Sequence, residues 1–458
     1  MASTIVSRTQ SLSESAAGRR TWTFSCWFKR NGISSSQELF GTDANGARSN
    51  NYNIIDLNAS NQIDFAGYES GITFRKTTNR LFKDTNAWYH LVIAFDSTQS
   101  TADDRIKIYI NGVRETSFGT STNPAQDHQS KFFSSGKVHA FGRSSQTFDG
   151  VISHCHATEG TAYAPTVFGS TDATTGEWKI NTSPSVSYGT NGFFLFKNDN
   201  AVTNQAGNSS GNFAVTAGTL TKTEDNPSNV FATLNPLFYS ADITLSNGNT
   251  KAVEASNNWR SAYSNIGHST GKFYAEAKIT YQSGNEAYIG VAHEDHMNGT
   301  AAYGGSTSGP NSGGYDYIGY SNKSVGIYSN GQQHYPSTVQ TTASFQSNGD
   351  IIGIAVDIPG NKFYLSKNGQ WNNAAGNAWD STTFDASVGA ISWTSKWTSG
   401  QVFVGCSPNE STWEWNFGNG YFGTTAVSSA GTNASNIGIF EYDVPTGFTA
   451  WSTKGLNE

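Results

Sequence analysis

Apolar and polar residues alternate over many short stretches of this chain, and Gly, Asn, Ser or Asp bounds most of them. Residues 105–110 (RIKIYI) show the pattern most clearly, because a period of two places the isoleucines on one face of a strand. No stretch keeps an apolar period of 3.6 residues, so any helix should be short. The pattern predicts strands at residues 21–30, 52–57, 62–65, 71–75, 88–96, 105–110, 113–118, 137–142, 148–156, 193–196, 242–245, 271–281, 287–292, 315–320, 324–329, 350–357, 362–366, 401–406 and 412–417.

Asn-Gly pairs at residues 111–112, 247–248 and 368–369 each follow a predicted strand. Both residues accept a positive φ angle, which the tight turns of two-residue β-hairpins require. We therefore expect a hairpin at each pair. At the first pair, residues 113–118 should form the return strand.

The distribution of these strands predicts an all-β fold with two jelly-roll-like β-sandwiches in tandem. Residues 1–200 should form the first sandwich and residues 241–425 the second. Residues 201–240, rich in Asn, Gly, Ser and Thr, are predicted to be an irregular linker. Residues 426–458 should be a C-terminal extension that packs back on the second sandwich.

Composition narrows the function. Charged residues make up 14% of the chain and aromatic residues 13%, with 48 glycines, which is typical of short strands and uncharged polar surfaces. The formal net charge of −7 and the lack of basic runs give nucleic-acid binding no electrostatic support. No run of ~18 apolar residues predicts membrane insertion, and the first residues do not look like a secretory signal.

The three cysteines, Cys26, Cys155 and Cys406, are widely separated and do not have the spacing of a disulfide framework or a zinc site. We expect three buried thiols. Cys26 and Cys155 would come close together if the strands that carry them pair.

Four segments of the first half resemble the laminin-G/concanavalin-like family: residues 22–30 (WTFSCWFKR), 88–96 (WYHLVIAFD), 105–113 (RIKIYINGV) and 148–152 (FDGVI). Four segments of the second half resemble SPRY domains: residues 271–278, 288–291, 345–369 and 415–418. Both resemblances imply a β-sandwich that serves as a binding module.

The connecting segments are similar to those of bacteriophage virion proteins of the tail-fibre or host-recognition kind; they are residues 164–172, 176–179, 188–194, 232–237 and 445–454. The resemblance implies a virion surface protein on the tail or capsid, made in the host cytoplasm, that binds a host-surface glycan or protein during adsorption. The resemblance also implies other virion proteins as partners. It implies a homo-oligomer as well, and phage fibres suggest a trimer.

One departure from this family keeps a second function open. Tail fibres usually carry an adaptor or a trimeric shaft before the binding modules, whereas the first sandwich here should begin within about twenty residues of Met1. The alternative is a head-decoration or tail-assembly subunit, in which the same surfaces contact other virion proteins.

We predict that the chain is not an enzyme. Glycosidases need two carboxylates across the scissile bond, and the E-x-D-x-x-E strand of concanavalin-like hydrolases is missing. Glu414 stands alone in its strand, and residues 294–296 (EDH) are interpreted as a solvated loop. No Gly-x-Ser-x-Gly motif supports a serine nucleophile.

We expect no cofactor; a calcium ion is the one candidate. Asp96, Asp103 and Asp104 lie around one predicted loop, and calcium prefers such carboxylate ligands. An ordinary acidic turn is the competing interpretation. His154 and His156 should share one strand face, but a third zinc ligand is not evident.

Two aromatic-rich segments are candidate ligand-binding surfaces, because exposed aromatic rings can stack on a ligand. In the first, Tyr303, Tyr315 and Tyr317 flank a Gly- and Ser-rich loop that resembles an adaptable paratope in composition. In the second, residues 370–398, we select Trp379 and Trp397 as contacts; Trp371 and Trp393 lie in the same segment. Core packing is the alternative for each tryptophan.

Overall fold

The structure is a computed structural model that describes residues 4–33, 35–43, 51–143, 145–174, 176–197, 200–240, 242–256, 260–282, 287–297, 317–333 and 339–454. The chain divides into two compact units. The first unit comprises residues 1–222 and 226–228, and the second comprises residues 223–225 and 229–458. Each unit is described by itself below.

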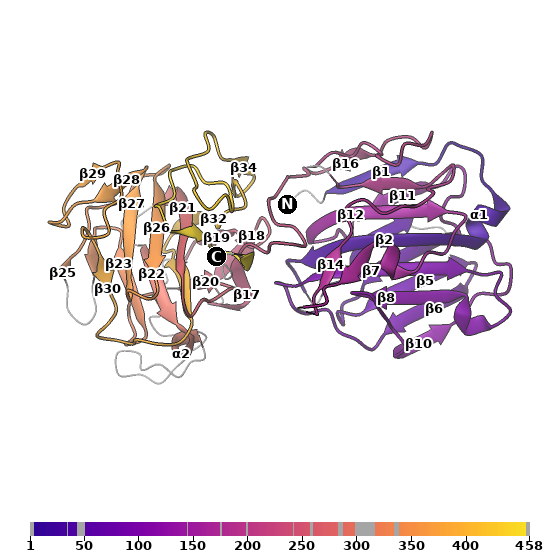
Figure 1. Ribbon diagram of the computed structural model, residues 1–458, viewed down its shortest axis with the longest axis horizontal. Coiled ribbons are helices and arrows are strands. Elements are labelled where there is room, and N and C mark those ends of the chain that lie inside the picture. Colours follow the sequence, from indigo (N-terminus) through magenta and orange to yellow (C-terminus); the bar gives the residue numbers. More distant parts are fainter. Residues whose placement is uncertain are drawn as a thin grey trace. The chain divides into compact units, whose positions relative to one another are not determined.

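Two large antiparallel sheets form the first unit (Figure 1). The eight-stranded sheet has the order β10 (Phe118–Thr122), β6 (Ile72–Thr78), β5 (Ile63–Glu69), β4 (Asn51–Leu57), β3 (Gln37–Thr42), β11 (Val138–Phe141), β1 (Ile5–Thr9), β16 (Ala214–Ala217). The six-stranded sheet has the order β15 (Phe193–Leu195), β12 (Gly150–Glu159), β2 (Thr21–Arg30), β7 (Trp88–Asp96), β8 (Ile106–Ile110), β9 (Val113–Arg114). Smaller elements are α1 (Ala16–Arg20), the 3₁₀ turns Ala102–Asp104 and Pro165–Val167, and the hairpin β13 (Gly169–Thr171) with β14 (Trp178–Ile180).

The core of the first unit lies between these sheets. Phe24 of the six-stranded sheet stacks on Phe40 of the eight-stranded sheet, with ring centroids 5.2 Å apart. The opposite face of the six-stranded sheet is also covered, because Trp178 of β14 donates a 2.9 Å hydrogen bond to His90 Nδ1. His90 in turn stacks on Trp27. Strand β2 is therefore buried on both faces, and its burial does not alternate.

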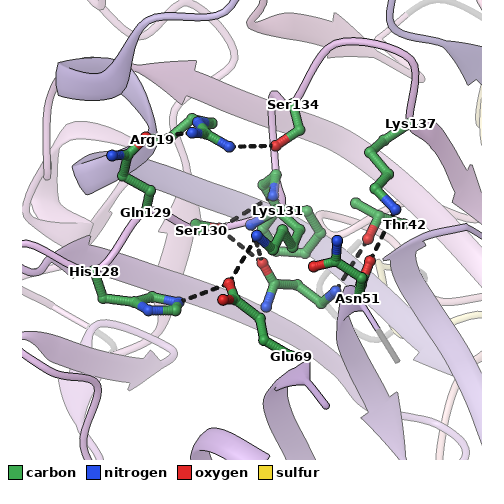
Figure 2. A network of polar contacts seen from close by, with 12 residues as sticks. Arg19, Thr42, Asn51, Glu69, His128, Gln129, Ser130, Lys131, Ser134 and Lys137 are labelled. Atoms are coloured by element: carbon green, nitrogen blue, oxygen red, sulfur yellow. Dashed lines mark hydrogen bonds and ion pairs between the residues drawn. The ribbon is translucent and has the colours of Figure 1, made fainter. Parts of the chain in front are cut away.

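An irregular loop, residues 128–137, is attached to the eight-stranded sheet by the polar contacts of Figure 2. The loop places Phe132 in the core. Asn53 Oδ1 accepts a hydrogen bond from the backbone N–H of Lys131, whose Nζ lies 2.8 Å from Glu69 Oε1. The apolar side chain and these polar contacts together hold the loop against the sheet.

The second unit is also built from two large sheets (Figure 1). The five-stranded sheet has the order β17 (Leu234–Tyr239), β20 (Ala262–Ser264), β31 (Val402–Ser407), β22 (Tyr288–His293), β23 (Ser324–Tyr328). The larger sheet has the order β18 (Ile243–Ser246), β19 (Lys251–Glu254), β32 (Ser411–Asn416), β21 (Lys272–Gln282), β26 (Ile351–Asp357), β27 (Lys362–Lys367), β28 (Gln370–Asn372), β29 (Trp379–Ser381). Two short strands extend this sheet: β30 (Ile391–Ser392) pairs with β27, and β35 (Thr449–Ala450) pairs with β21. The remaining elements are α2 (Glu294–Met297), β24 (Gln332–Gln333), β25 (Val339–Gln340), β33 (Tyr421–Phe422) and β34 (Thr425–Ala426).

The C-terminal extension covers the outer face of the larger sheet. Phe440 and Phe448 of the extension join Tyr274, Tyr364 and Trp371 of the sheet in one buried cluster. The inner face packs against the five-stranded sheet. Because both faces are covered, strand β26 is buried along its whole length. Residues 426–454, the described part of the predicted extension, belong to the second unit and contribute to this packing.

The all-β fold class is confirmed, since each unit is a sandwich of two sheets around a core. The three Asn-Gly hairpins are confirmed as well, with positive φ at both residues of each pair. The return strand at residues 113–118 is shorter than expected, because β9 ends at Arg114 and Phe118 begins β10 in the other sheet. Residues 317–320 of the strand predicted at 315–320 form a turn, closed by the N–H of Tyr320 and the carbonyl of Tyr317.

The segment that we predicted as a linker, residues 201–240, belongs to the two sandwiches instead. Phe213 enters the core of the first unit, and residues 214–217 form its edge strand β16. Leu234 enters the core of the second unit at the start of β17. The composition concealed this, because single apolar residues anchor a segment that is otherwise rich in Asn, Gly, Ser and Thr.

Within the described residues, no helix has the length and apolar character needed to cross a membrane.

Candidate functional site

Residues 370–398 contain the aromatic side chains that we selected, and packing divides them into two groups. Trp397 is only 6% exposed and stacks on Trp393, with ring centroids 5.7 Å apart. Trp393 stacks in turn on Phe363 in the core between the sheets. Trp397 is therefore a core residue and not a surface contact.

The second group lies on the outer face of the larger sheet, beside the C-terminal extension. Phe384 packs edge-on against Trp371 and Tyr364, with both centroid distances 4.9 Å. Phe448 of the extension supports Phe384 from 5.4 Å. Trp371 is 93% buried in this arrangement, yet it still borders a surface pocket.

The pocket has a volume of about 190 Å³ and lies among β27, β28, β29 and the loop after β29. Typical pockets for drug-sized ligands are larger, ~300–1,000 Å³, whereas a cavity of ~150 Å³ admits a benzene-sized ring. The pocket therefore suits one six-membered ring. Its lining includes Tyr364, Trp371, Asp380, Ser381, Phe384 and Asp385.

Two carboxylates give this pocket its charge. Asp385 is exposed, and its Oδ1 accepts hydrogen bonds from the N–H and the hydroxyl of Ser387 at 2.8 and 2.7 Å. These bonds hold the pKa of Asp385 below its usual value. Asp380 is exposed as well and accepts a 3.4 Å hydrogen bond from Asn373 Nδ2. The lining residues include no lysine, arginine or histidine.

Three of the polar lining side chains donate hydrogen bonds to acceptors within the protein. Asn372 Nδ2 donates to the carbonyl of Thr341 at 3.0 Å. Ser381 Oγ donates to the carbonyl of Thr383 at 2.7 Å, and Asn373 Nδ2 donates to Asn377 Oδ1 at 2.9 Å as well as to Asp380. The pocket consequently offers mainly aromatic surface and hydrogen-bond acceptors to a ligand.

The other predicted contacts lie elsewhere. Tyr303 and Tyr315 fall outside the described residues. Tyr317 is half-buried and stacks on Tyr288 at 4.5 Å. Trp379 is half-buried and donates from Nε1 to the carbonyl of Ser344 at 2.9 Å. Neither residue lines the pocket, so none of the selected contacts that the structure describes belongs to its lining.

The structure does not assemble the proposed calcium ligands. Asp96 accepts hydrogen bonds from the side chains of Thr98 and Gln99 within its own turn. Asp103 lies 3.9 Å from Lys76, and Asp104 lies 3.2 Å from Lys107. Among the residues that can be described, no group of three or more His, Cys, Asp or Glu is arranged to hold a metal ion. Local turn bonds and lysine neighbours thus occupy these carboxylates, as in an ordinary acidic turn.

The histidines and cysteines of β12 are also structural. Pairing of β12 with β2 shifts register between Ser153 and His156, and His154 has a φ of 44°, so His154 and His156 do not follow a regular alternation. Cys155 lies beside Cys26, as expected if their strands pair; burial and this neighbour raise the pKa of the Cys155 thiol. All three cysteines are buried and free.

The EDH sequence, interpreted as a solvated loop, forms the short helix α2. Its His296 is fully buried, where its Nε2 contacts the Tyr263 hydroxyl and its Nδ1 lies 2.9 Å from Ser321 Oγ. Burial lowers the pKa of His296 to about 3, so this imidazole is neutral. Glu414 is largely buried and pairs with Lys251 at 3.0 Å. His296 and Glu414 are thus both buried and engaged by neighbours within the second unit.

The sequence analysis missed a row of acidic residues, because the row runs across neighbouring strands. In the strand register, Glu38 of β3 lies opposite Asp56 of β4, and Asp56 lies opposite Asp64 of β5. Arg75 binds Asp64 through two hydrogen bonds of 2.9 and 2.7 Å. No spacing along the chain marks such a row, since only strand register brings its members together.

Residues 7–158 match the family model of the concanavalin A-like lectin/glucanases superfamily (Laminin_G_3). The concanavalin-like part of the resemblance is thereby confirmed for this region. No curated protein matches the chain.

Several solved structures are similar to parts of the chain. Stonustoxin matches 40% of this chain and 26% of its own, about a quarter of its length, with 17% identity and a TM-score of 0.28. The TRIM65 PSpry domain matches 40% of this chain and 89% of its own, with 11% identity and a TM-score of 0.29. The SPRY domain of human HERC1 matches 40% of this chain and 96% of its own, with 12% identity and a TM-score of 0.27.

Proposed function

We propose that this chain is a bacteriophage virion surface protein that binds a host-surface glycan through the pocket beside β28. The observation that carries the proposal is the pocket itself, where the aromatic side chains of Trp371 and Phe384 meet the carboxylates of Asp380 and Asp385. Sugars combine apolar C–H surface with hydroxyl donors, and such a lining can receive both.

The assignment to a phage particle rests on the connecting segments, residues 164–172, 176–179, 188–194, 232–237 and 445–454. A one-ring pocket predicts modest affinity per site. Many copies on one particle would raise the effective affinity, because binding of one copy increases the local concentration of the next. This is the behaviour that an adsorption protein needs.

The test uses two neighbouring alanines. Ala374 lines the pocket and Ala375 does not, and both are exposed. An Ala374→Trp substitution should fill the pocket, whereas Ala375→Trp adds the same ring beside it. The purified full-length chain, in both variants and unchanged, is mixed with the bacterial host of the encoding phage before infection.

Blocking of adsorption by the unchanged chain and by Ala375→Trp, with at least a tenfold loss for Ala374→Trp, supports the proposal. Equal blocking by both variants would place the binding surface elsewhere. Release of reducing ends from host polysaccharide by the unchanged chain would make the protein a depolymerase.

A second candidate function, a head-decoration or tail-assembly subunit, is favoured by the edges of the eight-stranded sheet. Strands β10 (FGTST) and β16 (AVTA) form these edges, are largely exposed and contain no charged residue. Edge strands without charges expose backbone groups that can pair with another chain. Failure of the unchanged chain to bind cells, together with its stable incorporation into purified particles, would favour this function.

A further inference from the structure

The pocket beside β28 carries unbalanced negative charge. Asp380 and Asp385 line it, and neither carboxylate forms an ion pair with any residue that the structure describes. Lys362 lies beside the pocket, with its Nζ 3.5 Å from the carbonyl of Ala386 and over the ring of Tyr364, which is a lining residue. Lys362 does not line the pocket. An anionic ligand would therefore meet like charge without a compensating donor.

The hydrogen-bonding capacity of the pocket points in the same direction. Asn372, Asn373 and Ser381 already donate to protein acceptors. Ser387 donates two hydrogen bonds to Asp385 Oδ1. The second carboxylate oxygen, Asp385 Oδ2, accepts no hydrogen bond from the residues that the structure describes. A ligand that donates hydrogen bonds is thus better matched than one that must accept them.

The aromatic lining adds a third preference. The faces of Trp, Tyr and Phe rings carry negative electrostatic potential, and a cation near them gains roughly 0.5–1 kcal/mol at exposed sites. Trp371 and Phe384 border the pocket, and Phe384 is the more exposed of the two rings. The Tyr364 ring is nearly fully buried and already contacts Lys362. The two carboxylates and the accessible parts of Trp371 and Phe384 together favour an ammonium group.

We infer that the pocket selects an amino sugar with a free ammonium group over N-acetylated and acidic sugars. This inference rests on the proposed glycan-binding function and specifies its ligand class. The sugar ring packs on Trp371 and Phe384, and its ammonium group donates to Asp380 and Asp385. A lysine side chain carries the same charge but lacks the ring that fills a pocket of about 190 Å³.

The experiment measures binding of four probes to the full-length chain by calorimetry at low salt: glucosamine oligomers, N-acetylglucosamine oligomers, galacturonic acid oligomers and lysine amide. Glucosamine oligomers should bind at least tenfold more tightly than the N-acetylated ones, and galacturonic acid oligomers should not bind. Affinity should fall as the pH rises above the pKa of the sugar amine, and also with added salt.

The variants Asp380→Asn and Asp385→Asn should each weaken glucosamine binding about two- to fivefold, the range for a partly exposed charge pair. Asn can keep the acceptor role of Asp385 toward Ser387, so the turn should persist. Asp443→Asn is the matched control, because Asp443 is exposed, caps Thr432 in the same way and does not line the pocket.

Two failures can be told apart. Equal binding of glucosamine and N-acetylglucosamine oligomers, both lost in Ala374→Trp, would overturn the charge inference and leave glycan binding standing. Binding of lysine amide but of no sugar would overturn the amino-sugar assignment in favour of a protein ligand. If no probe binds and Ala374→Trp still blocks adsorption normally, the proposed function fails as well.

Discussion

The two units hold down their irregular C-terminal segments with buried charges of opposite sign. In the first unit, the Arg8 guanidinium donates to the carbonyls of Gly211 and Asn191 at 2.8 and 3.0 Å. In the second, the Glu276 carboxylate accepts the backbone N–H groups of Glu441 and Tyr442, each at 2.9 Å. Both devices satisfy backbone groups that a packed segment would otherwise leave unpaired.

The difference lies in how the two charges respond to pH. Burial lowers the pKa of Arg8 only to about 10, so the guanidinium stays charged at neutral pH. Burial raises the pKa of Glu276 to about 7, although its hydrogen bonds from Glu441, Tyr442 and Tyr274 oppose the shift. A cationic anchor is therefore insensitive to ordinary pH changes, and a carboxylate anchor is not.

The largest expected effect is that of Arg8→Met. The buried carbonyl of Asn191 and the part-buried carbonyl of Gly211 would lose their donor, at ~1–3 kcal/mol each. The cation would also no longer contact the rings of Phe193 and Phe213. We expect the free energy of unfolding of the first unit to fall by about 4 kcal/mol. Urea denaturation measures this, and the loss should be equal at pH 5 and pH 8; a pH-dependent loss would contradict the comparison.

The next effect is the pH dependence of the second unit. Because the pKa of Glu276 is raised in the folded protein, its stabilising contribution is complete below the unfolded value of 4.5 and is lost as the pH rises through about 7. The free energy of unfolding should decrease by about 3 kcal/mol over this interval, at 1.36 kcal/mol per pKa unit. Hydrogen exchange at the amides of Glu441 and Tyr442 should quicken in parallel.

Glu276→Gln serves as the control for that prediction. It removes the titrating group, so the pH dependence should disappear, while the amide leaves one backbone N–H poorly satisfied. If the Glu276→Gln variant keeps the full pH dependence of the unfolding free energy, another residue must cause that dependence.

The smallest effect concerns residues 128–137, the loop of Figure 2. Several polar contacts hold this loop, whereas one buried charged side chain holds each of the C-terminal segments. Asn53 Oδ1 accepts from the Ser130 hydroxyl at 2.9 Å and from the N–H of Lys131. Asn53→Ala should cost about 2 kcal/mol of unfolding free energy, since these donors lose their acceptor. The control is Asn373→Ala, which removes hydrogen bonds at the exposed surface. Thermal unfolding measures the loss of stability in both variants. Equal losses would show that the Asn53 hydrogen bonds stabilise the protein no more than surface ones do.

The candidate site shows where sequence reasoning stopped. Aromatic composition selected residues 370–398 as a candidate binding segment. It could not separate Trp397, which lies in the core, from Trp371 and Phe384, which border the pocket. All three side chains are large and apolar, and only the sheet face on which each one lies distinguishes them.

What the amino-acid sequence determined by itself was local: the period-two strands, the Asn-Gly turns with positive φ at Asn111 and Asn368, and hence the all-β fold. Tertiary structure alone decided the acidic row of Glu38, Asp56 and Asp64, the anchors Arg8 and Glu276, and the incorporation of residues 201–240 into the two sandwiches. The reason is physical. Turn and strand preferences depend on neighbouring residues, whereas burial and charge pairing depend on residues that only the completed sheets bring together.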